Sequence, residues 1–241
     1  MGRRFLAMSG IVLLAGAVLA AADFWEETQF TAWSDKDVEQ MMNDSPWAKR
    51  LTVRFPRPPR ESAGVGGAGS AQGRAGAAVA GALGGGGGAG RFGGRDGFGG
   101  GSPQSRLVIQ WRSALPIRHA RVRRRIGEGG TLDPEVRETL AQSPQGYLVA
   151  VTGLPRQFGR LTPEALMAEA RLERKGKSPI GPAQAQPQRA ERGVTIVYLF
   201  PKDDAIVLED KEVEFITKVG DVTVKKKFTL EDMGFNDQLE L

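Results

Sequence analysis

A glycine-rich tract in the first half of the chain sets the strongest limit on how the protein can fold. Of the 38 residues from Gly64 to Gly101, 19 are glycine and 8 are alanine. Such a segment loses much backbone entropy on ordering and offers few side chains to bury. We therefore predict a disordered glycine-rich insertion over residues 61–102.

The segment before the tract, residues 23–60, is too short to fold alone,. Its Trp33 and Trp47 must find apolar surface elsewhere, and residues 103–241 are the part of the chain that can supply it. We expect the tract to interrupt one folded unit, made of residues 23–60 and 103–241, and not to separate two independent domains.

The first 22 residues have the pattern of a secretory signal peptide. Arg3 and Arg4 precede an apolar run from Ile11 to Leu19, and three alanines follow that end at Ala22,. The run is shorter than the roughly 20 residues that cross a membrane, although an uncleaved anchor is the alternative. We expect export to an extracytoplasmic location, periplasmic or secreted, with no transmembrane span after signal removal.

Two short helices are predicted around the tryptophans. Ser34 and Asp37 form a capping pair that begins the first helix,. Its apolar positions share one face at helical spacing: Val38, Met41 and Met42,. Pro46 is placed to begin the second helix. Trp33 and Trp47 could form an aromatic platform for a sugar, but no cluster of polar side chains surrounds them, and packing is the favoured interpretation.

The C-terminal third predicts a β-hairpin between Glu212 and Leu230, with Gly220-Asp221 as a type II′ turn,. This register pairs apolar residues on one face and opposite charges on the other. The predicted pairs are Val219–Val222, Thr217–Val224, Val213–Phe228 and Glu214–Lys227. Further strands are predicted at Leu51–Phe55, Arg106–Trp111, Tyr147–Val151 and Val194–Phe200. The fold class predicted is α+β: an antiparallel or mixed sheet with this hairpin, and helices packed on one side.

An arginine-rich helix is predicted after Ala114, with Pro116 in its first turn,. Helical spacing places Leu115, His119, Val122 and Ile126 on one apolar face,. The arginines on the outside form a possible partner-binding surface: Arg118, Arg121, Arg123, Arg124 and Arg125,. A solvated face is the alternative, as is pairing with Glu128, Glu135 and Glu138.

Composition limits the chemistry. The chain has no cysteine and one histidine, His119, which excludes disulfides, thiolate catalysis and cysteine-bound metals,. A Ser-His-Asp triad would need His119, which we expect to be a partly buried structural residue, and no G-x-S-x-G elbow is present. The acidic clusters Asp203-Asp204 and Glu209-Asp210 could bind calcium, but turn-flanking acids explain them more simply. We predict no catalytic, metal-binding or cofactor-binding residues and no cofactor.

Several motifs carry a resemblance: W-S-D-K-D-V from Trp33, S-P-W-A-K from Ser45, V-I-Q-W-R-S-A-L-P from Val108, V-T-G-L-P from Val151, and K-F-T-L-E-D-M from Lys227. With them the chain resembles an uncharacterised family of exported bacterial proteins. The resemblance covers most of the predicted folded unit. It implies export and a shared fold, and it brings no assigned activity or site residues.

We expect a non-catalytic exported envelope protein that binds an anionic envelope component or a protein partner. The alternative is a metal-independent hydrolase that uses a carboxylate pair on an envelope polymer. The end of the tract, G-R-F-G-G-R-D-G-F-G-G-G, resembles the repeats of some RNA-binding proteins,. The export signal argues against a nucleic-acid partner.

Overall fold

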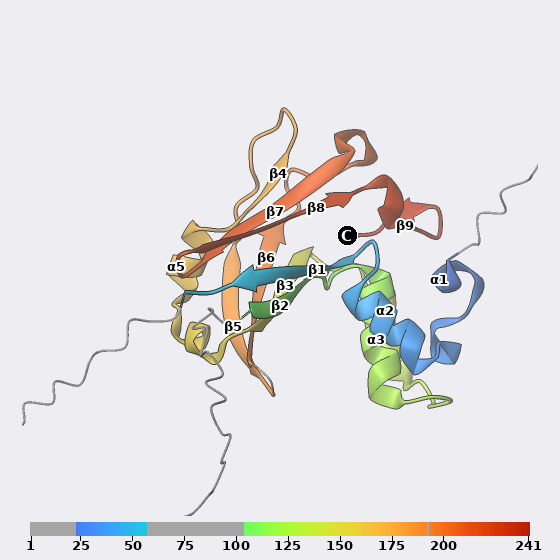
Figure 1. Ribbon diagram of the computed structural model, residues 1–241. Coiled ribbons are helices and arrows are strands. Elements are labelled where there is room, and N and C mark those ends of the chain that lie inside the picture. Colours follow the sequence, from blue (N-terminus) through green and yellow to red (C-terminus); the bar gives the residue numbers. More distant parts are fainter. Residues whose placement is uncertain (1–22, 57–103, 192) are drawn as a thin grey trace, which may run out of the picture.

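The computed structural model describes residues 23–56, 104–191 and 193–241. The predicted signal peptide, residues 1–22, and the predicted disordered insertion, residues 61–102, lie outside the described residues. Within them the chain has the predicted α+β fold, and the strand pairs of its sheets are antiparallel (Figure 1).

A five-stranded sheet forms the base of the molecule. Its spatial order is β1 (Ala48–Arg54), β2 (Gln104–Trp111), β3 (Gly146–Leu154), β6 (Gly193–Pro201) and β5 (Gln184–Ala190). A three-stranded sheet is made of β4 (Arg171–Arg174), β7 (Glu212–Val219) and β8 (Val222–Thr229). The short strands β9 (Gly234–Phe235) and β10 (Gln238–Leu239) pair near the C-terminus.

The core lies between the five-stranded and three-stranded sheets, where inward-facing aromatic rings meet. The Trp111 and Phe228 ring centroids are 5.8 Å apart, and those of Tyr198 and Phe215 are 5.6 Å apart. The buried Tyr198 hydroxyl also shares a hydrogen bond of 2.9 Å with the Thr217 hydroxyl. Both hydroxyl groups therefore have a hydrogen-bond partner within this apolar layer, as buried polar groups generally do.

The C-terminal hairpin is confirmed in register. Strands β7 and β8 pair Val219 with Val222 and Glu214 with Lys227, and the other predicted pairs are also present. Gly220 has a φ of +61°, whereas Asp221 has a negative φ. A positive φ at the first central residue only is the pattern of a type II′ turn, and glycine adopts it without steric cost.

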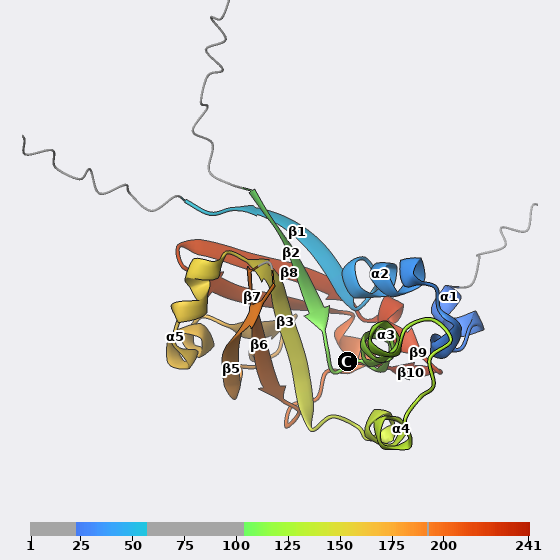
Figure 2. The same ribbon diagram turned by 90° about the horizontal axis from the view of Figure 1, so that it is seen from below.

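Helices α1 (Phe24–Glu27), α2 (Asp35–Asn43), α3 (Leu115–Ile126) and α4 (Pro134–Ala141) gather at one end of the sheets, while the short α5 (Pro163–Ala168) lies at the other (Figures 1 and 2). The 3₁₀ turns are η1 (Phe30–Ala32), η2 (Arg156–Arg160), η3 (Leu208–Asp210) and η4 (Glu231–Met233). The predicted capping pair at the start of α2 is present: the Asp37 backbone N–H donates to the Ser34 hydroxyl, and the Ser34 N–H donates to the Asp37 carboxylate.

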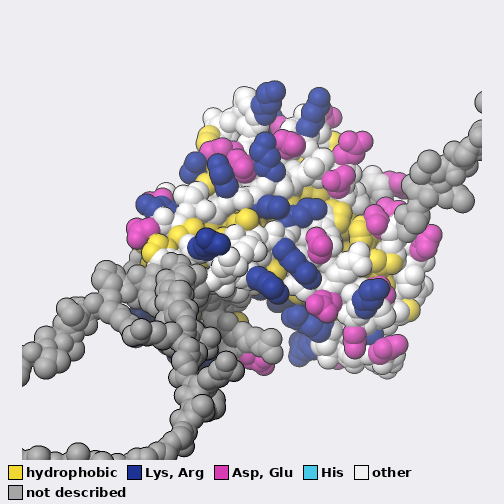
Figure 3. All heavy atoms as spheres, in the orientation of Figure 1, with side chains coloured by type: hydrophobic (Ala, Val, Ile, Leu, Met, Phe, Trp, Pro, Cys, Tyr) yellow, Lys and Arg dark blue, Asp and Glu magenta, His cyan; other side chains and the backbone are white. Residues whose placement is uncertain are grey.

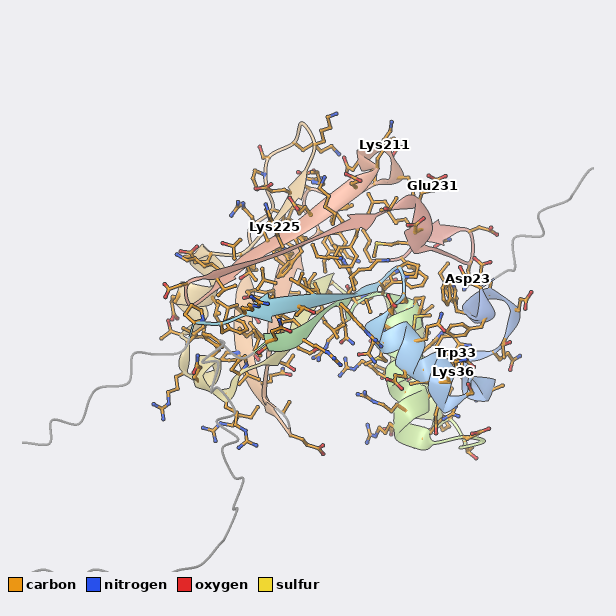
Figure 4. All side chains as sticks on the ribbon, viewed as in Figure 1. Asp23, Trp33, Lys36, Lys211, Lys225 and Glu231 are labelled. Atoms are coloured by element: carbon orange, nitrogen blue, oxygen red, sulfur yellow. The ribbon has the colours of Figure 1, made fainter. Side chains whose placement is uncertain are left out.

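The packing interpretation of the two tryptophans is confirmed. Trp33 and Trp47 are 1% and 0% exposed. The Trp33 indole N–H donates to the Thr28 carbonyl at 3.0 Å, and that of Trp47 donates to the Glu240 carbonyl at 2.8 Å. Figure 4 shows Trp33 at the start of α2, among the helices. Neither ring offers an open face to a sugar.

Some local predictions were wrong. No helix begins at Pro46, because Ser45 bridges to Ala48 in a tight turn that leads directly into β1. Thr162-Pro163-Glu164 resembles a helix cap and predicts a helix as far as about Arg174, but α5 ends at Ala168, and Arg171–Arg174 forms strand β4. The buried side of α3 is also rotated relative to the predicted apolar face. Its buried residues are Pro116, Ile117, Ala120 and Arg123, while Leu115, His119, Val122 and Ile126 are only half-buried.

His119 is a partly buried structural residue, as predicted. Its ring stacks on Phe30 with centroids 4.1 Å apart. The rings of Trp33 and Phe235 form T-shaped pairs with it, at centroid distances of 6.4 and 6.0 Å. Burial, with a smaller effect from the Arg118 charge, lowers the pKa of His119 from 6.5 to about 4. The imidazole is therefore neutral at neutral pH.

This pKa shift predicts a pH-dependent stability. Between pH 6.5 and 4 the unfolded chain binds a proton at His119 that the folded chain does not, so stability is lost as the pH falls through this window,. We expect His119→Phe to remove roughly 2 kcal/mol of the stability difference between pH 7 and pH 5. Urea unfolding of both proteins at the two pH values measures it, and equal pH dependence would contradict the assignment.

Candidate functional site

Helix α3 carries the predicted arginines at the end of the molecule where the helices gather. The helix begins after Ala114 with Pro116 in its first turn, and it ends at Gly127, whose φ of +78° favours glycine,. Arg121, Arg124 and Arg125 are exposed. These three side chains are therefore available to a partner.

Arg118 is half-buried and has a structural contact of its own. Its guanidinium donates to the Gln142 carbonyl at 3.0 Å and to the Thr139 carbonyl. Both carbonyls belong to the C-terminal end of α4, where backbone acceptors lack partners within the helix. Arg118 thus fastens α4 to α3, and this role limits what it can offer to a ligand.

The prediction that Arg123 belongs to the binding surface was wrong. Its side chain is 0% exposed and lies between α2 and the turn after α3, 3.7 Å from the Asp35 carboxylate and 3.9 Å from that of Glu128. Among the described residues, its three guanidinium nitrogens have no hydrogen-bond partner. Arginine has a long apolar stem, so it can be buried where helical spacing alone suggests exposure.

Arg112, just after β2, is a charged residue that the sequence analysis did not select. It is half-buried beside Arg121 and Arg124. Burial, followed by the charges of Arg121 and Arg124, lowers the pKa of Arg112 to about 10. Burial and Arg124 also lower the pKa of Arg121. Arginine side chains carry a positive charge in proteins, so three positive charges line these adjoining parts of the surface.

No carboxylate within the described part of the chain neutralises this group. The ion pairs formed there involve other arginines and lysines: Arg123, Arg171, Arg174, Lys177 and Lys227. Of the glutamates predicted as possible partners, Glu128 lies within ion-pair distance of an α3 arginine, the buried Arg123. We call Arg112, Arg121, Arg124 and Arg125 the arginine surface.

Two grooves meet at Arg121. The first, of about 380 Å³, lies between α3 and α4, and its apolar lining includes Val122, Val136 and Leu140. The second, of about 290 Å³, lies on the five-stranded sheet. Its lining residues are Arg112, Arg121, Leu148, Gln184, Gln186, Gln188, Val197 and Leu199. The arginine surface therefore borders two hollows with partly apolar linings.

The outer face of the five-stranded sheet is basic. Its five strands contain no aspartate or glutamate. The register places the exposed Arg50 opposite Val108, and the exposed Arg106 opposite Thr52, on the face away from the core. No described helix crosses β2 and β3 on this side (Figure 2). Positive charge thus continues from the arginine surface across the sheet.

The opposite side of the molecule has mixed charge. Acidic and basic side chains are interspersed over the three-stranded sheet (Figure 3). A pocket of about 950 Å³ lies here, and Lys211 and Glu231 stand at its end of the sheet (Figure 4). Its floor holds Glu173 directly opposite Glu214.

This carboxylate pair does not favour a hydrolase. The Glu173 side chain is 39% exposed and accepts a hydrogen bond of 2.6 Å from Arg171. A general acid needs a raised pKa, which burial away from positive charge produces. Glu173 is instead exposed and bound by Arg171, so a surface pair compensated by a neighbouring arginine is the simpler description.

The predicted acidic clusters serve the fold. The Asp204 carboxylate binds the guanidinium of the buried Arg174, and Asp210 lies 2.6 Å from the Lys177 ammonium and 3.7 Å from Arg174. These contacts join β4 and the turn that follows it to η3 and the turn that precedes η3. In the part of the chain that the structure describes, no group of three or more His, Cys, Asp or Glu is placed to hold a metal ion.

None of the described helices is both long enough and apolar enough to cross a membrane. Comparison of the chain with protein-family models, curated proteins and solved structures finds no match.

The burial of Arg123 makes a stability prediction. Its two carboxylate neighbours are 88% and 77% exposed, so removing the guanidinium leaves no buried charge behind. We expect Arg123→Met, which keeps the apolar stem, to be within about 1 kcal/mol of the wild type or more stable. Arg123→Ala should lose roughly 2 kcal/mol of packing.

Chemical unfolding of both variants measures the difference. A loss of several kcal/mol in Arg123→Met would show that the guanidinium charge itself stabilises the fold. Equal stability of the two variants would show that the stem contributes nothing.

Proposed function

We propose that the protein is an exported, non-catalytic binding protein that holds an anionic envelope component on the arginine surface. The observation that carries the proposal is geometric: Arg112 and Arg121 line one groove, Arg121 and Arg124 line the adjoining one, and none of the three forms an ion pair with a carboxylate of the described residues. Like charges held together raise the free energy of the unliganded protein. An anion bound among them relieves this repulsion.

The residue type supports the same conclusion. Guanidinium groups form paired, charge-assisted hydrogen bonds with carboxylates and phosphates. A face that served only solubility would keep its charges apart and fully hydrated. Here Arg112 is half-buried at the edge of a groove, and its buried Nε has no partner among the described residues. Such an arrangement suits recognition better than solvation.

The location is part of the proposal. The signal-like residues 1–22 support export, and an exported protein meets acidic polymers and anionic lipids of the cell envelope,. The binding role needs no nucleophile, metal or cofactor. The positive sheet face around Arg50 and Arg106 would attract such a ligand from a distance and orient its approach,.

The test replaces three charges at once. We expect the variant Arg112→Gln/Arg121→Gln/Arg124→Gln to bind polygalacturonate and polyglutamate at least about tenfold more weakly than the wild type, because each lost contact is charge-assisted. Wild-type binding should also weaken with added salt. Titration calorimetry at two salt concentrations measures both effects.

A matched control removes three charges from the other side of the molecule. Lys175, Lys218 and Lys225 are exposed, and Figure 4 shows Lys225 on β8, in the three-stranded sheet. The variant Lys175→Gln/Lys218→Gln/Lys225→Gln should bind like the wild type. Equal weakening in both variants would mean that net charge alone acts, and wild-type protein that binds no polyanion would refute the proposal.

A further inference from the structure

We infer that the ligand is an acidic polysaccharide, whose acid groups contact the arginine surface while its hydroxyl groups contact a row of glutamines on β5. This inference rests on the proposed function and adds the chemical class of the ligand. It comes from the groove on the five-stranded sheet, where guanidinium, amide and aliphatic side chains line one hollow.

The glutamine row is a regular array of hydrogen-bonding groups. Gln184, Gln186 and Gln188 are exposed and alternate with the more buried Ala185 and Pro187. Alternate residues of a strand are about 6.8 Å apart on the same face. Each amide offers two donor hydrogens and one acceptor oxygen. No side-chain hydrogen bond to another described residue occupies these amides, so they are available to a ligand rich in hydroxyls.

The floor of the groove is aliphatic. The register places Gln184 beside Leu199, which lies beside Leu148, and it places Gln186 beside Val197. Leu148, Val197 and Leu199 are half-exposed. A sugar ring has C–H faces and hydroxyl edges, so it can lie on an aliphatic floor while its edge bonds to amides. Binding sites generally combine such an apolar surface with a few placed polar groups.

The arginines that would bind the acid groups of the ligand lie at one end of this groove, beside its aliphatic residues. Arg112 and Arg121 line this groove together with the glutamines, and Arg121 also lines the groove between α3 and α4. A neutral sugar would leave these charges without counterions. A linear polymer with a carboxylate or similar acid group on its sugar units matches both ends of the surface.

Other anionic ligands fit less well. Binding to a bilayer uses basic residues together with protruding apolar side chains. The large apolar side chains exposed among the described residues are Val207, just before η3, and Leu208, its first residue, and neither lines this groove. Single-stranded nucleic acid stacks on aromatic rings, and the groove lining has none. An acidic peptide added as a strand at β5 would meet Pro187, which lacks a backbone N–H,.

The experiment separates sugar recognition from charge recognition. The variant Gln184→Ala/Gln186→Ala/Gln188→Ala, purified from cells that express the full chain, should bind polygalacturonate about tenfold more weakly than the wild type, because up to three hydrogen bonds are lost. Its binding of polyglutamate, which has carboxylates but no sugar hydroxyls, should change less than about twofold. The glutamines are exposed, so the variant should fold like the wild type.

Controls and outcomes keep the two proposals apart. Gln40, Gln142 and Gln157 are exposed elsewhere, and their triple alanine variant should bind both polymers like the wild type. If the β5 variant keeps full affinity for polygalacturonate while the arginine variant loses it, the sugar class is wrong and the anion-binding function stands. Tighter wild-type binding to phosphatidylglycerol vesicles or to polyglutamate than to polygalacturonate would also overturn the inference.

Discussion

Antiparallel pairing of β1 with β2 is the contact on which the rest of the structure depends. It joins strands from the two sides of residues 57–103, with Ala48 opposite Gln110 and Arg54 opposite Gln104. Because β1 follows directly on α2, this pairing also brings α2 against α3 and buries Trp47 under the C-terminal residues. The N-terminal segment is thus an integral part of the core. Its aromatic rings are buried there: Trp25, Trp33, Trp47 and Phe55,.

The two sheets differ in the charge of their outer faces. The inner faces of both are apolar, so only the outer faces can carry charge. The three-stranded sheet balances its charges locally, as in the Glu212–Lys227 ion pair at 3.3 Å. The five-stranded sheet has no acidic residue, and its Arg50 and Arg106 have no cross-strand acid to meet. The outer face of the five-stranded sheet therefore has an excess of positive charge, whereas the charges on the outer face of the three-stranded sheet are balanced.

Most of the fold could be predicted from the sequence in the regions where local patterns agree with tertiary packing. The C-terminal hairpin combines a turn glycine, apolar alternation and complementary charges, and each specifies the same register. Strand β5 is not among the predicted strands, because glutamine, alanine and proline have low strand propensity,. Its period of two, Q-A-Q-P-Q, was the available signal, and an edge position tolerates the proline,.

Only part of the arginine surface could be predicted from the sequence. Spacing along one helix identified Arg121, Arg124 and Arg125, which are exposed, but it could not separate them from Arg123. That distinction depends on α2, which packs on one side of α3 and places Asp35 within 3.7 Å of Arg123. Arg112 was missed because it belongs to another element, and only the fold brings the end of β2 beside α3. Sequence periodicity predicts which residues of one helix or strand share a face. It does not predict which residues of different elements become neighbours.

The side chains of the arginine surface lie on a helix or directly after a strand, and not on a long loop. Arg121 and Arg124 project from a helix whose neighbour α4 is fastened by Arg118, and Arg112 follows a strand with partners on both sides. Charges on such supports cannot separate freely to relieve their repulsion, as they could on a loop. The helix and the strand therefore hold the three side chains near one another before a ligand arrives. Removing Arg118 would loosen α4 and enlarge the first groove without removing any of the three clustered charges, so the surface would keep its charge and lose its shape.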